Sequence, residues 1–162
     1  MRILRQTGFE CTLLIAGEGE RAYTAELKKL VADLELHDRV HFLGHVSGEL
    51  KLSLYQAADI FALPTSQENF GFVFPEALAS GTPIITTKGV DIWAELKAGG
   101  ACSIVDRTPD AFAAEIHAIL SDRDRFEQMQ AAAKPFAFTA YDEDRLLAAF
   151  ESLYHESITH LN

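Results

Sequence analysis

Residues 60–87, IFALPTSQENFGFVFPEALASGTPIITT, contain the pattern that decides the fold. An apolar run opens the stretch, a second one closes it, and a short helix is expected between them at about 75–80. Pro75 suits the first helical position, and Gly81 suits the residue just past the helix end. Both apolar runs are continuous rather than alternating, which is typical of strands buried on both faces of a parallel sheet. The stretch therefore predicts a strand–helix–strand unit.

The same alternation extends along the rest of the chain. The continuous apolar runs are 12–16, 40–43, 60–63, 83–87 and 102–105. Further segments with apolar residues at helical spacing are 20–36, 48–58, 92–97, 109–120, 123–134 (which Pro135 is expected to end) and 142–158, with Asp142 as its N-cap. This order predicts an α/β fold with a doubly wound, Rossmann-like parallel sheet. We expect a single domain over 1–162, with its C-terminal helices at about 109–158.

The composition is that of a folded globular protein. The 162 residues predict one domain, and the 48% hydrophobic and 23% charged residues exclude an intrinsically disordered chain. The net charge is −10, and the basic residues are scattered. That balance argues against nucleic acid as a partner, since phosphate binding needs clustered Lys and Arg. No apolar run reaches the roughly 18–20 residues that span a bilayer, so we expect no transmembrane segment.

The two cysteines, Cys11 and Cys102, each lie at the edge of an apolar run. Lone thiols are typical of a reducing compartment and of buried packing positions. The N-terminus has no long apolar segment of the kind that marks a secretory signal. We therefore expect a cytoplasmic location and two free thiols.

Ligands of open parallel sheets bind outside the carboxyl ends of the strands. The predicted loops at that edge are 17–22, 44–48 and 64–76. In the first loop, Gly17, Gly19 and Ala22 match a dinucleotide-binding fingerprint. The acidic residue that would hold a ribose should end the second strand, but Asp38 precedes it. We therefore favour a plain tight turn over a nicotinamide site.

The 64–76 loop carries two glutamates, Glu68 and Glu76, with seven residues between them. Gly71 allows the backbone to approach a ligand closely. Free amides at a helix start favour an anion such as a diphosphate, and a carboxylate beside them can accept two hydrogen bonds from the vicinal diol of a sugar. On spacing alone, two solvated glutamates beside core phenylalanines remain the favoured interpretation, because Glu is mostly a surface residue.

A family resemblance changes this balance. Residues 66–71 and 76–85, SQENFG and EALASGTPII, resemble the E-x7-E region of retaining glycosyltransferases with the GT-B fold, and most closely the group 1, or family 4, enzymes. Residues 14–19 resemble the family's "LLIAGDG" turn, 40–46 its "V-x-F-x-G-x-V" strand and loop, and 54–60 its "LY-x-x-AD" helix end. The resemblance covers nearly the whole chain, and the E-x7-E segment is its specific part.

The resemblance implies the C-terminal, donor-binding half of a GT-B enzyme, which transfers a sugar from a nucleoside-diphosphate sugar to an acceptor with retention at the anomeric carbon. It implies that Glu68 is catalytic and meets the donor sugar, and that Glu76 binds the nucleotide ribose. Val46 would contact the base, and the Gly17 turn would also belong to the donor site. The backbone positions expected to hold the sugar and diphosphate are Asn69, Phe70 and Gly71. No metal or other cofactor is implied, because positive groups and helix dipoles stabilise the leaving diphosphate.

Two departures from the family pattern limit what we expect of this chain. The family's Arg and Lys that clamp the diphosphate would lie before residue 1, since residues 1–11 are too few for a preceding strand–helix unit. The N-terminal acceptor domain is also absent from the sequence. We therefore expect weak donor binding, no transfer by the chain alone, and weak self-association through an exposed cleft face. The alternative is a non-catalytic α/β module, either an interaction domain or a degenerate nucleotide binder.

Overall fold

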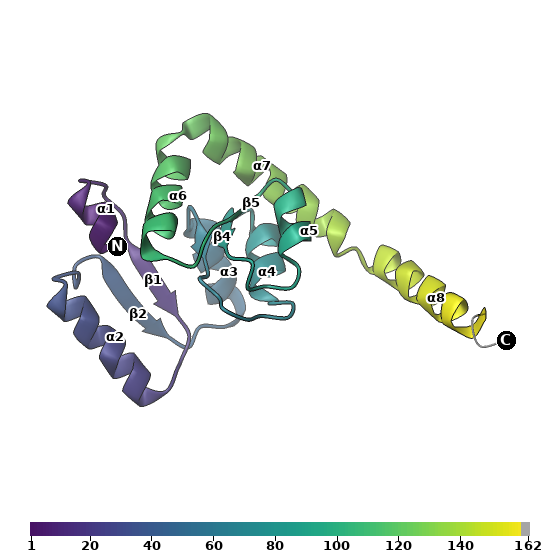
Figure 1. Ribbon diagram of the computed structural model, residues 1–162, viewed down its shortest axis with the longest axis horizontal. Coiled ribbons are helices and arrows are strands. Elements are labelled where there is room, and N and C mark those ends of the chain that lie inside the picture. Colours follow the sequence, from purple (N-terminus) through teal and green to yellow (C-terminus); the bar gives the residue numbers. More distant parts are fainter. Residues whose placement is uncertain (160–162) are drawn as a thin grey trace.

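The structure is a computed structural model that describes residues 1–159, so that residues 160–162 of the predicted domain lie outside the described residues. The strands are β1 (Leu13–Ala16), β2 (Val40–Gly44), β3 (Phe61–Ala62), β4 (Ile84–Thr86) and β5 (Cys102–Ile104) (Figure 1). The helices are α1 (Arg2–Gln6), α2 (Arg21–Asp33), α3 (Gly48–Ala57), α4 (Val73–Ser80), α5 (Trp93–Ala98), α6 (Pro109–Ser121), α7 (Arg123–Ala140) and α8 (Glu143–Thr159). The predicted alternation is confirmed, and α1 is an element that the sequence patterns did not predict.

All strand pairs are parallel, as predicted, but they form two sheets rather than one. One sheet has the order β1-β2 and the other the order β3-β4-β5. The ladders include a bond from Leu13 N to Arg39 O at 2.8 Å and one from Phe61 N to Pro83 O at 2.9 Å. Together the two sheets fit the Rossmann strand order 3-2-1-4-5-6, with β2 and β1 at positions 3 and 2, and β3, β4 and β5 at positions 4, 5 and 6. Position 1 of that order lies between β1 and β3. None of the described strands occupies that position, so β1 and β3 each have an unpaired edge.

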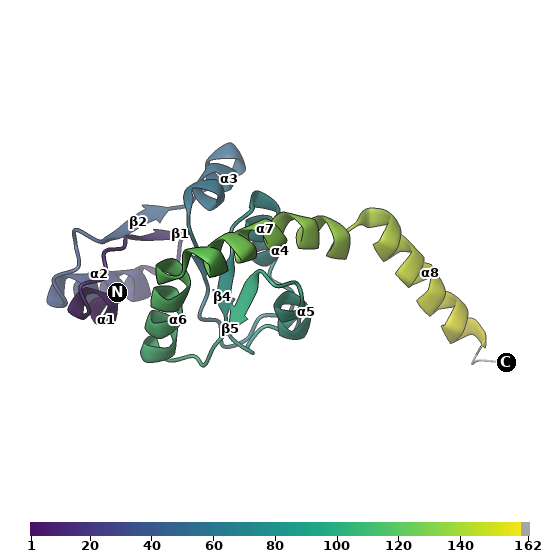
Figure 2. The ribbon, with the colours of Figure 1, turned by 90° about the horizontal axis from the view of Figure 1, so that it is seen from above.

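Strand β4 lies at the centre of the core because it is apolar on both faces. Ile84 and Ile85 are fully buried and, as neighbours in a strand, point to opposite sides. Ile84 packs in a cluster with side chains of α3, α4, α5 and α7, whereas Ile85 packs in a smaller cluster with α6 and α7. Figures 1 and 2 show β4 and β5 enclosed by these helices. The predicted covering of both sheet faces is therefore confirmed for β3-β4-β5.

Helix α4 begins two residues earlier than predicted, at Val73 rather than at Pro75. The amide of Phe74 already donates to the carbonyl of Gly71 at 2.9 Å, which starts the first turn before the proline. Pro75 is tolerated there because a first-turn residue needs no amide hydrogen. The predicted end is confirmed, since Gly81 adopts the left-handed conformation with φ of 91°.

Helix α7 runs through Pro135 to Ala140, so the prediction that this proline ends the helix was wrong. A proline inside a helix leaves the carbonyl four residues earlier without its donor. Here that carbonyl belongs to Ala131, which is exposed and can be hydrated. Ala133 and Ala137 are buried in the larger core cluster, and this packing holds the helix on both sides of the proline.

Helix α8 projects away from the rest of the molecule (Figures 1 and 2). Its predicted cap is confirmed, because the amide of Arg145 donates to the Asp142 carboxylate at 3.0 Å. Apolar side chains exposed on α8 are those of Leu146, Leu147, Phe150, Leu153, Tyr154 and Ile158. The predicted weak self-association through an exposed cleft face stays a prediction.

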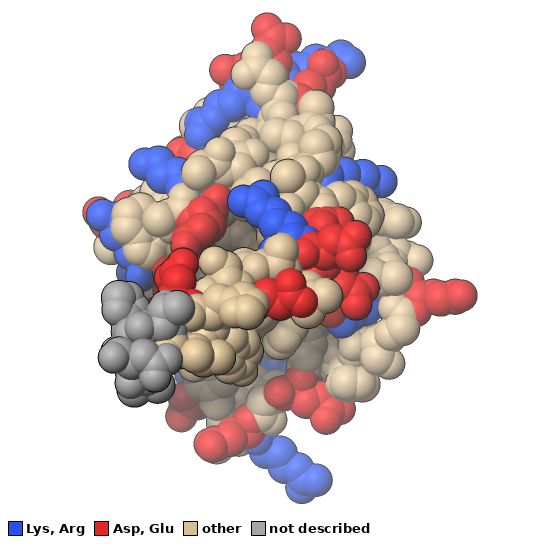
Figure 3. All heavy atoms as spheres, turned by 90° about the vertical axis from the view of Figure 1, so that its right-hand side faces the viewer, with Lys and Arg blue, Asp and Glu red and all other residues tan. Residues whose placement is uncertain are grey.

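The molecular surface carries mixed charge. On the face that Figure 3 shows, basic side chains are scattered among acidic ones rather than gathered in one area. This face carries acidic and basic side chains side by side, on a chain whose net charge is −10. Within residues 1–159, no helix has the length and apolar character needed to cross a membrane.

Candidate functional site

Glu68 lies in the long loop between β3 and α4, at the carboxyl edge where ligands of parallel sheets bind. Its backbone is held from both sides by the loop that follows β4. The amide of Glu68 donates to Gly89 O at 2.8 Å, and its carbonyl accepts from the amide of Asp91 at 2.9 Å. The side chain is half-buried. The structure therefore fixes the backbone of this glutamate while leaving its carboxylate partly accessible.

The loop after β4 is itself fastened to the loop after β3 through Thr87. Its buried hydroxyl donates to Thr65 O at 2.6 Å and accepts from the amide of Gly89 at 3.0 Å. A Cβ at Gly89 would lie 2.6 Å from Thr65 O and 2.9 Å from the carbonyl carbon of Ser66, so only glycine fits. We did not predict Thr87 or Gly89 as site residues. The signal available in the sequence was a Thr-x-Gly at the end of an apolar strand.

Gly71 shapes the same loop where it enters α4. It has φ of +67°, a conformation that favours glycine. A Cβ at this position would lie 2.7 Å from Cε2 of Phe74 and 2.9 Å from Cγ of Glu68. A core ring and the side chain of Glu68 therefore limit this position to glycine. The predicted close approach of the Gly71 backbone to a ligand stays a prediction.

Glu76 lies in the first turn of α4 and contacts α3. One carboxylate oxygen accepts from the Lys51 ammonium at 2.6 Å, and the other accepts from the Tyr55 hydroxyl at 3.5 Å. Burial, followed by the charge and hydrogen bond of Glu76, raises the pKa of Tyr55 to about 12, so that its hydroxyl keeps its proton at neutral pH. Sequence reasoning assigned no role to Lys51 or Tyr55.

The other predicted positions of this loop differ in their surroundings. Asn69 is exposed, whereas Phe70 is half-buried. The Phe70 ring lies 5.1 Å from that of Phe72 and 5.5 Å from that of Tyr141, both in edge-to-face geometry. The Phe70 side chain therefore packs against other aromatic rings, and the predicted contact with a ligand would be made by the Phe70 backbone.

The remaining predicted residues follow β1 and β2. Val46 is half-buried between β2 and α3, just before the helix that carries Lys51. Gly17 is exposed, with φ of 127°, and its amide donates to Gly44 O at 2.7 Å. That bond ties the two loops together, so the Gly17 amide is already engaged and the Gly17 contribution to a donor site would come from its turn geometry.

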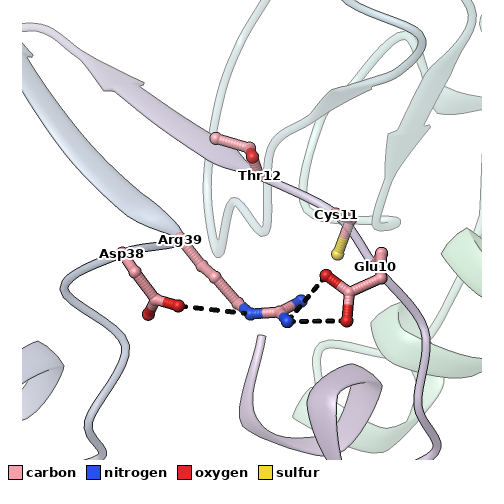
Figure 4. A pocket seen from close by; sticks show the side chains of 5 residues that line it. All are labelled: Glu10, Cys11, Thr12, Asp38 and Arg39. Carbon is pink, nitrogen blue, oxygen red and sulfur yellow. Dashed lines mark hydrogen bonds and ion pairs between the residues drawn. The ribbon is translucent and has the colours of Figure 1, made fainter.

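A polar pocket of about 280 Å³ lies at the opposite edge, where β1 and β2 begin (Figure 4). Within it, the Arg39 guanidinium is 2.7 Å from the Glu10 carboxylate and 3.8 Å from that of Asp38. Burial raises the pKa of the neighbouring Cys11 thiol, which disfavours the reactive thiolate. Two carboxylates around one guanidinium leave a net negative charge, and the pocket lies at the amino ends of the strands, so it is a poor candidate for the ligand edge.

The chemistry available at the site is that of carboxylates, backbone amides and ammonium groups, which are those of Lys51 and of Lys88 in the loop after β4. Residues 1–159 contain no group of three or more His, Cys, Asp or Glu side chains that could hold a metal ion. Both thiols, Cys11 and Cys102, are free, as predicted. Burial raises the pKa of Cys102 to about 12, so this thiol is protonated at neutral pH.

Comparison with known proteins matches most of this chain to one family. Residues 1–136 match the family described as Glycosyl transferases group 1. The D-inositol 3-phosphate glycosyltransferase of Corynebacterium urealyticum is 37% identical over 100 residues, which are 61% of this chain and 24% of that protein. Sucrose-phosphate synthase from Thermosynechococcus elongatus aligns over 92% of this chain and 39% of its own, with a TM-score of 0.77 and 24% identity. Anabaena HepE, solved in complex with UDP, aligns over 93% and 41%, with a TM-score of 0.75 and 22% identity.

The extent of these matches decides what they show. The chain spans about a quarter of that curated relative and about two-fifths of each solved chain. At such low identity, the match to the solved structures shows a shared GT-B fold and nothing more. The family match includes both glutamates and the loops that hold them. This chain belongs to the group 1 glycosyltransferases.

Proposed function

We propose that this chain is the donor-binding part of a retaining glycosyltransferase that uses a nucleoside-diphosphate sugar. The observation that carries the proposal is the pair of carboxylates at the carboxyl edge of the sheet. Glu68 is fastened by its backbone to the loop after β4, and Glu76 stands in the first turn of α4. HepE, whose fold this chain shares, was solved in complex with UDP, which supports a nucleotide as the ligand.

The proposed roles follow from the chemistry of each group. Glu68 meets the hydroxyls of the donor sugar at the reacting centre, and Glu76 accepts hydrogen bonds from the ribose diol. The backbone of 69–71 and the amino end of α4 hold the diphosphate, since helix amides and the helix dipole favour an anion. Val46 contacts the base through its backbone, and Gly17 contributes the turn beside it.

We propose that the acceptor binds to a part of the enzyme other than the domain described here, and that transfer needs both parts. The short coverage of the relatives supports this division, and we propose that this chain alone transfers no sugar. We propose a reaction without a metal or other cofactor, in which positive groups and helix dipoles stabilise the leaving diphosphate. Two free thiols support a reducing, cytoplasmic location.

An NMR titration of the chain with UDP, GDP, ADP and NAD⁺ tests the proposal. We expect saturable shifts with one nucleoside diphosphate, unchanged by EDTA, in residues of the loops after β2 and β3. Glu76→Ala should weaken this binding by at least about 10-fold, because it removes a charged acceptor. Glu127→Ala is the control, since Glu127 pairs with Arg123 on the exposed side of α7.

The possible outcomes separate the competing functions. Binding that Glu76→Ala weakens and Glu127→Ala leaves unchanged supports the donor site and identifies the base. Binding of NAD⁺ alone would contradict the glycosyltransferase site. If none of the four nucleotides shifts any resonance, the non-catalytic α/β module becomes the better description of this chain.

A further inference from the structure

Two side chains of helix α3 contact the carboxylate of Glu76, the residue that the proposed function places against the ribose. Lys51 and Tyr55 are one helical turn apart on α3, so their side chains lie on the same face. Lys51 donates to Oε1 of Glu76 at 2.6 Å, and Tyr55 donates to Oε2 at 3.5 Å. Each oxygen of the carboxylate therefore faces a donor on α3, and the short contact with Lys51 is the stronger of the two.

Tyr55 is a rigid part of this arrangement. It is only 9% exposed, and its ring packs edge-to-face on Phe61 of β3 at 5.5 Å. Its carbonyl accepts from the Thr82 hydroxyl at 2.5 Å, just beyond the end of α4. These contacts fix α3 against both β3 and α4. The Tyr55 hydroxyl thus reaches Glu76 from a position that the core determines.

Lys51 differs from Tyr55 because it is partly exposed. The side chains of Lys51 and Glu76 are 34% and 32% exposed, so the ion pair is open to a ligand on one side. A carboxylate has about four acceptor sites, and the two contacts from α3 occupy two of them. The remaining sites can accept from two vicinal hydroxyls without breaking either contact.

We infer that Lys51 and Tyr55 are positioning residues that aim the Glu76 carboxylate at the ribose diol of the donor nucleotide. This inference rests on the proposed function. Without Lys51 the glutamate side chain can adopt other rotamers, and a ribose must then fix it at an entropic cost during binding. The effect depends on the hydroxyls of the ribose. A nucleotide that lacks them gains nothing from an ordered Glu76.

Calorimetric titration with UDP and with 2′,3′-dideoxy-UDP separates this role from a merely structural one. If the chain binds GDP or ADP instead of UDP, that nucleotide and its 2′,3′-dideoxy form are used. We expect Lys51→Met to weaken binding of the nucleotide by about 5–20-fold and binding of its dideoxy form by less than about 2-fold. Lys51→Arg should restore most of the affinity, and Tyr55→Phe should cost about 2–5-fold. In a Glu76→Gln background, Lys51→Met should cost almost nothing further, because the two act as a unit.

Lys29→Met is the matched control. Lys29 forms an ion pair of the same 2.6 Å length with Asp33, but on α2. An equal loss for the nucleotide and its dideoxy form in Lys51→Met would overturn the inference and indicate a general effect of charge or folding. Unchanged affinity in both Lys51→Met and Tyr55→Phe would overturn it as well. Failure of the wild-type chain to bind any nucleoside diphosphate would instead refute the proposed function, and this inference with it.

Discussion

Replacement of Gly71 by alanine should destabilise the chain by about 2–5 kcal/mol, through two separate costs. The first is conformational, because φ is +67° and a Cβ in the left-handed region costs about 1–2 kcal/mol. The second is steric, because the new Cβ would lie 2.7 Å from Phe74 and 2.9 Å from Glu68. Phe74 is fully buried and cannot move aside, and overpacking of this kind costs about 1–3 kcal/mol.

Gly44→Ala isolates the first cost. Gly44 has nearly the same φ, +69°, but a Cβ there would meet nothing within 4 Å. We therefore expect Gly44→Ala to cost only about 1–2 kcal/mol. Urea unfolding measures both variants, with the midpoint reporting stability and the slope reporting whether the transition itself has changed. For a chain of this size, each kcal/mol lowers the melting temperature by about 2–4 °C.

The comparison of the two variants tests the argument directly. If Gly71→Ala were no less stable than Gly44→Ala, the contacts with Phe74 and Glu68 would not limit what fits at this position. If both variants unfolded within about 0.5 kcal/mol of the wild type, the argument from backbone conformation would fail too. A larger loss in Gly71→Ala alone is the result that the structure requires.

Three further results are expected. Iodoacetamide at pH 8 should modify Cys11 well before Cys102, whose pKa burial raises to about 12; equal rates by mass spectrometry would contradict this. The free energy of unfolding should be constant up to about pH 9 and fall toward pH 12. Folding raises the pKa of Cys102 from 9.0, and that of Tyr55 from 10.0, to about 12. The unfolded chain therefore releases these two protons at lower pH than the folded chain does, which favours unfolding. Urea midpoints that stay unchanged up to pH 11.5 would refute that reasoning. The amide of Leu14, which faces the unpaired edge of β1, should exchange with deuterium faster than that of Ile15; the reverse order by NMR would place a partner at that edge.

Local signals in the sequence were sufficient for most of the elements. The start of α4 is instructive, because Pro75 indicated a helix start and the helix does begin nearby, at Val73. The two-residue difference arises from the bond between Phe74 N and Gly71 O, which a proline pattern does not encode. Pro135 shows the opposite case. A strong local signal for a helix end was overridden by the packing of α7 against α4.

The arrangement of the strands depended on contacts that no local pattern contains. Continuous apolar runs predicted parallel strands, and every pair is parallel. The same runs also predicted burial on both faces, but Leu14 in β1 is 47% exposed. Burial of a strand depends on the neighbours that cover it, and β1 has a described partner strand on one edge alone. The separation into two sheets is therefore a property of the pairing rather than of any single run.

The candidate site shows the same division between local and distant information. Glu68 and Glu76 belong to one short segment, so a motif could identify them together. Lys51 is 25 residues from Glu76, and its significance exists only because α3 packs on α4. Spacing could have shown that Lys51 and Tyr55 share a helix face, but not which carboxylate that face meets. A local motif thus identifies the two glutamates, whereas residues distant in the sequence determine how the Glu76 carboxylate is held.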